Sequence, residues 1–228
     1  MTSEKKLTAR EAYEQGTCYQ FDTESLSLGP WTSFSMINDP KHMSFVLARY
    51  KFCAKMLEGR AKVAEVGSGD GFGLPIVASA VGEVCCLDWD QRLLDSIKGR
   101  LPFLKNVSYH CVDLNEKPAD VKVDAVYMID VIEHIDPEAE ETFMKHVVDC
   151  IDEDGIIIIG TPSIHAEQYQ SERSRVQHIN LKSQKTLREL TARYFKNVFL
   201  FGMNDEVLHT GYAPMCHYIW AIGVGRKA

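Results

Sequence analysis

Residues 65–73 read EVGSGDGFG, and every second position from Gly67 to Gly73 is glycine. The stretch follows a short apolar run and precedes a segment with helical spacing. A glycine-rich turn between a strand and a helix lets the backbone approach a ligand at the carboxyl end of the strand. The stretch therefore predicts a ligand site at such a strand end.

The two common phosphate-binding fingerprints do not fit this loop. A dinucleotide fingerprint needs a third glycine where Phe72 stands, and no Lys-Ser or Lys-Thr pair follows to complete a nucleoside-triphosphate loop. The loop by itself therefore does not identify its ligand.

Beyond residue 40, apolar runs alternate with segments of helical spacing. The predicted strands are 62–67, 83–88, 107–114, 123–130, 155–161, 197–203 and 216–224. The predicted helices are 41–57, 72–81, 90–100, 137–151 and 183–195, with Asp136 as the N-cap of the fourth. This alternation predicts an α/β fold, a doubly wound and mostly parallel sheet of seven strands. No helix separates the last two runs, which predicts an antiparallel strand at the sheet edge.

Two segments stand outside this alternation. Residues 1–40 are polar but carry several aromatic side chains, so we expect a helical N-terminal cap or lid over the ligand; a helix packed on the sheet with a mobile tail is the alternative. The aromatic residues are Tyr13, Tyr19, Phe21, Trp31 and Phe34. Residues 41–228 then form one domain, in which the polar stretch 163–182 is expected to be a substrate loop.

Composition excludes several classes of partner. The formal net charge is −7, which argues against long-range attraction to nucleic acid or to an anionic membrane. No apolar run is long enough to span a bilayer, and the first residues, MTSEKKLTAR, lack the apolar core of a secretory signal. The seven cysteines include no CxxC pair, so we expect buried thiols in a reducing cytoplasm.

Acidic residues at strand ends narrow the ligand to a nucleoside. Asp88 ends the second predicted strand, where a carboxylate can accept both hydroxyls of a ribose, and Trp89 beside it can pack on a base. Asp113, at the end of the third strand, can accept from an adenine amino group. The alternatives are a helix-capping role for Asp88 and an ordinary turn at Asp113.

These motifs, in this order, resemble the class I S-adenosylmethionine-dependent methyltransferases. The resemblance rests on the glycine loop, Asp88, Val112-Asp113-Leu114 and the Asp130-Val-Ile-Glu-His134 motif, and it covers residues 60–162. Within the class, the sequence is most similar to the small-molecule group that includes the ubiquinone-type O-methyltransferases. The resemblance implies S-adenosylmethionine as cofactor. It implies these cofactor-binding residues: Glu65, Gly67, Ser68, Gly69, Asp88, Trp89, Asp113, Leu114, Ile129 and Asp130.

The expected reaction is transfer of a methyl group to a small molecule, most simply at a hydroxyl oxygen. A histidine acting as general base would assist, and His178 and His134 are the two candidates. The predicted substrate contacts are His165, Tyr169, Arg173 and Arg175 in the substrate loop; His209 is a weaker candidate for base. The acceptor can be a sugar, a sugar-nucleotide, a phosphorus oxyacid or a phenol.

Three readings remain beside this one: a small-molecule N-methyltransferase, a non-catalytic binder of the same cofactor, and a dinucleotide-dependent oxidoreductase. No metal site is predicted, because Asp205, Glu206 and His209 lack a fourth ligand and a recognisable spacing. The sequence leaves the acceptor and the oligomeric state open.

Overall fold

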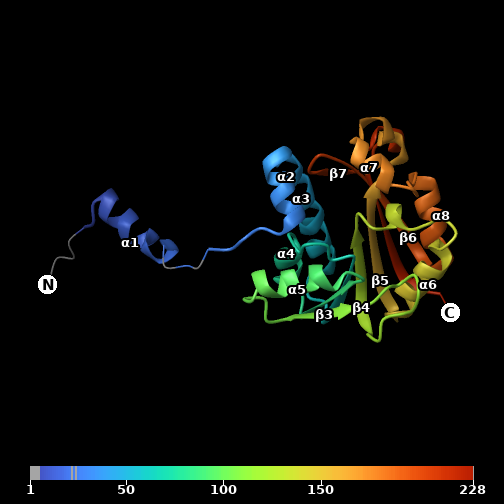
Figure 1. Ribbon diagram of the computed structural model, residues 1–228, viewed down its shortest axis with the longest axis horizontal. Helices are drawn as coiled ribbons and strands as arrows, with labels where there is room; N and C mark the ends of the chain where they lie inside the picture. The colour runs from blue at the N-terminus through green and yellow to red at the C-terminus, as the bar shows by residue number, and fades with distance from the viewer. Residues whose placement is uncertain (1–5, 22, 24, 228) are drawn as a thin grey trace.

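The computed structural model describes residues 6–21, 23 and 25–227, with the side chains of 18–21 left out. Tyr19 and Phe21 of the expected cap therefore lie outside the described side chains. Figure 1 shows a central twisted sheet with helices on both faces, and a first helix, α1 (Ala9–Phe21), that lies apart from it. Among the described residues, no helix combines the length and the apolar character that crossing a bilayer requires.

The sheet has eight strands in the order β3-β2-β1-β4-β5-β8-β6-β7. The strands are β1 (Lys62–Val66), β2 (Glu83–Asp88), β3 (Val107–Cys111), β4 (Val123–Ile129), β5 (Ile151–Pro162), β6 (Phe195–Asn204), β7 (Val207–His209) and β8 (Tyr218–Arg226). The first five strands pair in parallel, whereas β8 pairs antiparallel with both β5 and β6. This confirms the predicted fold class.

The strand count differs from the sequence prediction by one. The connection between the last two predicted strands contains a further strand, β7, which pairs antiparallel with the end of β6 and forms the sheet edge. Val207 is exposed, so this three-residue strand lacks the apolar alternation that marks a strand in sequence.

Helices cover the two faces unequally (Figure 1). One face carries α3 (Pro40–Leu57), α4 (Leu74–Ala78) and α5 (Gln91–Arg100), and the other carries α6 (Glu140–Asp149) and α8 (Gln184–Tyr194). Two more helices, α2 (Pro30–Asn38) and α7 (Glu172–Gln177), lie above the carboxyl ends of the strands. Short 3-10 turns complete the fold: η1 (Ile132–His134), η2 (Ile164–Tyr169) and η3 (Ala213–Met215).

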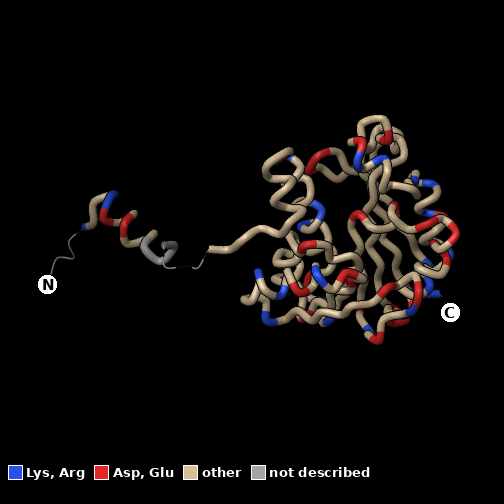
Figure 2. Tube along the Cα trace, in the orientation of Figure 1, with Lys and Arg blue, Asp and Glu red and all other residues tan. Residues whose placement is uncertain are grey.

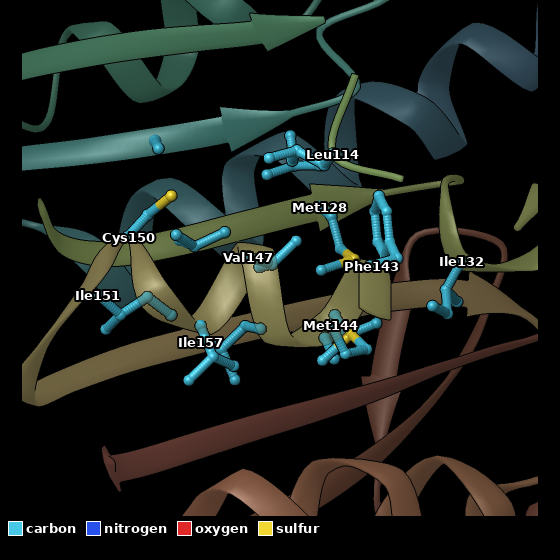
Figure 3. Packing of buried hydrophobic residues seen from close by; sticks show 14 of the residues in the cluster. Leu114, Met128, Ile132, Phe143, Met144, Val147, Cys150, Ile151 and Ile157 are labelled. Carbon is cyan, nitrogen blue, oxygen red and sulfur yellow. The ribbon is translucent and has the colours of Figure 1, made fainter. Parts of the chain in front are cut away.

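The predicted N-cap residue of helix 137–151 is wrong. Asp136 accepts from the backbone of Glu138 and forms a turn, and α6 begins four residues later at Glu140. Pro137 and Glu138 therefore belong to the connection rather than to the helix. The apolar face of α6 nevertheless follows the predicted spacing. Figure 3 shows Phe143, Met144 and Val147 packed in the buried cluster between this helix and the sheet.

Each glycine of the loop 67–73 faces a side chain from a different element. A Cβ on Gly69 would lie 2.9 Å from the Trp31 ring of α2, and one on Gly71 would lie 2.9 Å from Ile97 of α5. A Cβ on Gly67 would collide with Val131, and one on Gly73 would overlap the Tyr50 ring of α3. Gly67, Gly69 and Gly71 also have positive φ, which L side chains disfavour. The loop is thus a packing centre for three helices and the β4 exit.

The same loop holds α2 in place. Asp70 accepts hydrogen bonds from the backbone N–H of Thr32 (2.8 Å) and from its hydroxyl (3.0 Å). The carboxylate therefore caps the first turn of α2 from outside the helix, satisfying an N–H that has no partner within the helix. Gly29, at the N-cap, leaves room for Asp70 because it has no side chain.

We predict opposite effects for two glycine-to-alanine substitutions. Gly73→Ala should destabilise the fold by about 1–3 kcal/mol, because the added methyl must displace the buried Tyr50 ring. Gly99→Ala, in α5 with open space around it, should stabilise by about 0.4–1 kcal/mol through the unfolded chain. Urea unfolding of both variants measures the difference. Equal effects would show that the loop can relax around Tyr50.

Candidate active site

A cavity of about 200 Å³ lies where the loop after β1 meets the end of β4. The strand order reverses between these two strands, and in open α/β sheets ligands bind at that point. The cavity floor is the loop itself, and its roof comes from α2 and α3. Its lining includes Trp31, Tyr50, Gly67, Gly69, Ile129 and Asp130.

Asp88, at the end of β2, is tied to the glycine loop. It is 7% exposed, and its two oxygens accept from the backbone N–H of Gly69 (3.1 Å) and of Asp90 (2.9 Å). It does not cap α5, because Asp90 does so by accepting from Arg92. Burial raises the pKa of Asp88, while the bonds from Asp90 and Gly69 lower it. Each carboxylate oxygen can accept a further bond, so ribose hydroxyls can still be held here.

Asp88 and the other residues predicted for the nucleoside lie near these strand ends but outside the cavity lining. Trp89 is 68% exposed, and Leu114 is buried. Asp113 accepts from the backbone and the side-chain amide of Asn115. Their contacts with a nucleoside stay a prediction.

Two buried polar side chains, one in the loop and one in β1 below it, have free hydrogen-bonding capacity. Ser68 is 1% exposed, lines the cavity, and its hydroxyl has no partner in the described structure. Glu65 lies beneath it in β1, also 1% exposed, with one oxygen unpartnered. Burial raises the pKa of Glu65 to about 8, and the neighbouring hydroxyls of Tyr50 and Tyr127 oppose that rise.

Asp130 follows β4 in a strained conformation, with φ of 56°. Its backbone N–H donates to Gly160, and Arg49 of α3 donates to its carboxylate at 2.7 Å. The Arg49 guanidinium also lies 3.9 Å from the centre of the Tyr218 ring. Sequence reasoning missed Arg49, because a single arginine on an amphipathic helix has no distinguishing pattern.

A second cavity, of about 500 Å³, opens beside η2. It is lined by Phe45, Pro162, Ala166, Tyr169, Gln170, His178 and His217. The structure thus brings together two of the predicted residues, Tyr169 and His178. The Gln170 amide lies in the same wall with both its oxygen and its nitrogen buried and unpartnered.

Three other residues of the predicted substrate loop lie elsewhere. His165 is exposed on η2 and does not line the cavity. Arg173 reaches toward the Phe34 ring of α2, 5.5 Å from its centre, and Arg175 donates to the backbone of Gln168. The segment 163–182 also contains η2 and α7, which its weak periodicity did not reveal.

The two candidate histidines lie against each other, with ring centres 5.0 Å apart. His134 Nδ1 lies 3.0 Å from the carbonyl oxygen of Gln177; because a carbonyl can only accept, this nitrogen carries the proton and Nε2 is free to accept. His178 Nδ1 is buried without a partner. Burial, and then the charge of His134, lower the pKa of His178, so a neutral imidazole is favoured there.

Glu133, between Asp130 and His134, is fully buried. One of its oxygens accepts from the Thr161 hydroxyl at 2.9 Å, and the other has no partner. Burial, and then the neighbouring Asp130, raise the pKa of Glu133 to about 8. Asp205 and Glu206, the acidic residues considered above for a metal site, have structural roles. Glu206 accepts a hydrogen bond from Ser44 of α3, and Asp205 turns the chain between β6 and β7.

The comparisons with known proteins agree with this geometry. Residues 64–157 match the family model described as a methyltransferase domain. A probable S-adenosylmethionine-dependent methyltransferase of Mycobacterium tuberculosis is 28% identical over 102 residues, 44% of this chain and 35% of that protein. One from Mycolicibacterium smegmatis is 30% identical over 115 residues, 50% of this chain and 42% of that protein. The chain thus spans less than half the length of these relatives.

Solved structures show the same fold at low sequence identity. The methyltransferase domain of bacterial CtHen1-C has a TM-score of 0.67 at 18% identity, covering 79% of this chain and 99% of that one. The DhpI-SAM-HEP complex has a TM-score of 0.62 at 17% identity, covering 96% of both chains. The N-methyltransferase NodS of Bradyrhizobium japonicum has a TM-score of 0.58 at 12% identity, covering 83% of this chain and 99% of that one.

Residues 64–157 therefore match a methyltransferase domain, and the relatives support the class of S-adenosylmethionine-dependent methyltransferases that the sequence resemblance predicted. S-adenosylmethionine is the cofactor of this domain, and the residues present fit it. The cavity at the β1 and β4 ends has a glycine floor, the unpartnered Ser68 hydroxyl in its wall, and Asp88 beside the loop. The six cysteines with described side chains are free thiols, five of them buried, which leaves the prediction of a reducing compartment in place.

The buried carboxyl of Glu65 predicts a pH-dependent stability. Its pKa is raised from 4.5 to about 8 in the folded chain, so the stabilisation by the protonated form is complete at low pH and is lost as the pH rises through about 8. Glu65→Gln stays neutral, so its free energy of unfolding relative to wild type should increase from about pH 5 to pH 8. Urea unfolding across this range measures the difference. The exposed control, Glu58→Gln, should show no such trend. A pH-independent difference for Glu65→Gln would mean that Glu65 is already ionised in the fold.

Proposed function

We propose that the protein transfers the methyl group of S-adenosylmethionine to a hydroxyl oxygen of a small molecule. The observation that carries this proposal is the position of His178. It lines the second cavity, and Asp130, whose charge influences the pKa of His178, lines the first. A proton acceptor thus lines the space proposed for the methyl acceptor, within reach of the charge of Asp130 in the cofactor cavity.

S-adenosylmethionine, when bound, supplies a methyl group already activated by a sulfonium. The chain's own residues then have three tasks: to hold the cofactor, to align the acceptor oxygen behind the methyl group, and to exclude water. Asp88 and the glycine loop serve the first task, and Tyr169, Gln170 and His217 line the space for the second. Neutral His178, or His134 through its free Nε2, takes the proton that the hydroxyl loses.

The volume of the second cavity and the charge of the protein favour a small acceptor. A cavity of about 500 Å³ is in the range for a metabolite-sized ligand. Figure 2 shows Lys and Arg interspersed with Asp and Glu along the trace of the described residues, whereas nucleic-acid binding typically uses Lys and Arg clustered on one face. We therefore propose a sugar, sugar-nucleotide, phosphorus oxyacid or phenol rather than RNA.

We also propose that residues 30–38 act as a cap over the cofactor within the N-terminal segment 1–40. Trp31 lies against Gly69 and lines the cofactor cavity, and the bonds from Thr32 to Asp70 fix that position. A helix held on the loop in this way closes the cavity to water.

Cofactor binding should be visible as thermal stabilisation. S-adenosylhomocysteine at about 100 times its dissociation constant should add about 2.7 kcal/mol to the free energy of unfolding, and NAD should add nothing. Asp88→Ala should abolish the stabilisation, whereas Asp95→Ala, an exposed acid on α5, should retain it. Trp31→Ala should weaken binding if α2 is a cap. A response to NAD alone would refute the methyltransferase proposal, and unchanged binding in Trp31→Ala would refute the cap.

Acceptor chemistry is tested by a screen that measures released S-adenosylhomocysteine. We expect turnover with a hydroxyl or oxyacid acceptor. His178→Ala should lower the turnover about 10²–10⁴-fold while cofactor binding is unchanged, because it removes a proton acceptor. His110→Ala, on the distant edge strand β3, is the matched control. Turnover with amines alone would favour the N-methyltransferase reading, and tight cofactor binding without turnover on any acceptor would favour a non-catalytic binder.

A further inference from the structure

Gln170 carries a buried amide in the wall of the second cavity. Its side-chain oxygen and its side-chain nitrogen are both buried, and neither has a hydrogen-bond partner in the described structure. Buried polar atoms of native proteins are almost always hydrogen-bonded, so two such atoms on one side chain require an explanation. Because this side chain lines a cavity of about 500 Å³, there is room for a ligand to supply both partners.

The backbone around Gln170 is held on both sides. Its N–H donates to the carbonyl of Glu167 (3.1 Å), at the end of η2. The next residue, Ser171, is the N-cap of α7 and accepts from the backbone N–H of Ser174 at 3.1 Å. The side chain therefore starts from a fixed point between two helical turns. A recognition group supported in this way has less conformational entropy to lose when a ligand binds.

Aromatic side chains from three parts of the chain share this cavity lining. Phe45 comes from α3, Tyr169 from η2, and His217 from the residue before β8. The centres of the Tyr169 and His217 rings lie 6.1 Å apart, and Tyr169 is 74% exposed, so much of its surface is free to contact a ligand. Aromatic surfaces of this kind stack on planar rings.

The lining also favours a neutral group. As far as the structure describes it, the cavity is lined by no Lys, Arg, Asp or Glu side chain. The lowered pKa of His178, caused first by burial, favours its neutral form as well. An ionised group of a ligand would have no opposite charge to pair with here, and burying it unpaired is costly.

The Gln170 amide specifies the chemistry of its partner. The oxygen of a glutamine side chain accepts and its nitrogen donates, side by side in one plane. A carboxylate satisfies only the nitrogen, and an ammonium satisfies only the oxygen. A planar group that presents one donor beside one acceptor satisfies both atoms, as adenine does when a glutamine binds it in the major groove of DNA.

We propose that Gln170 is a specificity-determining residue for the methyl acceptor, and that it recognises a neutral planar ring with an amide-type edge, an N–H beside an acceptor atom. This inference rests on the proposed O-methylation, and the hydroxyl to be methylated lies elsewhere on the same molecule. Among the proposed acceptors it selects a sugar-nucleotide, through its base, or a phenol that carries a carboxamide. A simple sugar or a phosphorus oxyacid has no such edge.

Two small lactams test the edge directly. The lactam 2-pyridone presents an N–H beside a carbonyl, and N-methyl-2-pyridone has the same ring and carbonyl without the donor. Ligand-observed NMR titrations of the full chain should show that 2-pyridone binds at least about tenfold more tightly, because the methylated lactam leaves the Gln170 oxygen buried and unpaired. Equal affinity for the two lactams, no measurable binding of either, or tighter binding of the cyclic polyol inositol would overturn the proposal.

Substitution of Gln170 separates recognition from folding. Gln170→Met keeps a side chain of similar length but removes both polar atoms, so the preference for 2-pyridone over its N-methyl form should disappear. N-methyl-2-pyridone should still bind by stacking, which shows that the cavity is intact. The matched control Gln168→Met, an exposed glutamine of the same turn η2, should keep the wild-type preference. A preference that persists in Gln170→Met would overturn the proposal.

This inference and the proposed function fail separately. Methyl transfer to a hydroxyl acceptor without an amide-type edge, at the same rate in wild type and Gln170→Met, removes the recognition by Gln170 and leaves the proposed O-methylation. A lactam preference that depends on Gln170, without methyl transfer to any hydroxyl, removes the proposed function and leaves the recognition site.

Discussion

The close contact between the glycine loop and its neighbours is the constraint on which the rest of the structure depends. Four positions without side chains allow Val131, Trp31, Ile97 and Tyr50 to approach the end of β1. These residues come from the β4 exit, α2, α5 and α3, so one loop sets the position of three helices. The same absence of side chains keeps a cavity open at the switch point of the sheet, because the backbone rather than a methyl group forms its floor.

Around this floor, buried polar groups are arranged in pairs rather than left to solvent. Asp88 holds the loop through Gly69, Asp70 holds α2 through Thr32, and Arg49 reaches from α3 to Asp130. Each bond joins the cofactor edge of the sheet to an element that covers it. Because burial strengthens such interactions, α2, the floor and the β4 exit are positioned together.

The acceptor side is built differently, from groups with unused hydrogen-bonding capacity. Gln170, His178 and Glu133 each have a buried atom without a partner, and the tautomer of His134 is set by a backbone carbonyl. A chain that leaves this much polar capacity unsatisfied at one place pays for it in stability unless a ligand completes it. Gln170 and His178 line the second cavity, where a methyl acceptor would meet their unsatisfied atoms.

The apolar pattern of the sequence predicts the fold class, and its family resemblance supplies the cofactor and the strand ends expected to hold it. Apolar periodicity fixes which faces are buried, and the carboxyl ends of parallel strands meet at one edge, so Asp88 and Asp130 could be placed without coordinates. Only the tertiary structure decided that His134 meets His178, that Arg49 pairs with Asp130, and that Glu133 is buried with a free oxygen. These contacts join segments far apart in the chain through the weakly periodic stretch 163–182. The path of such a stretch is set by packing and hydrogen bonds, which leave no repeat in the sequence.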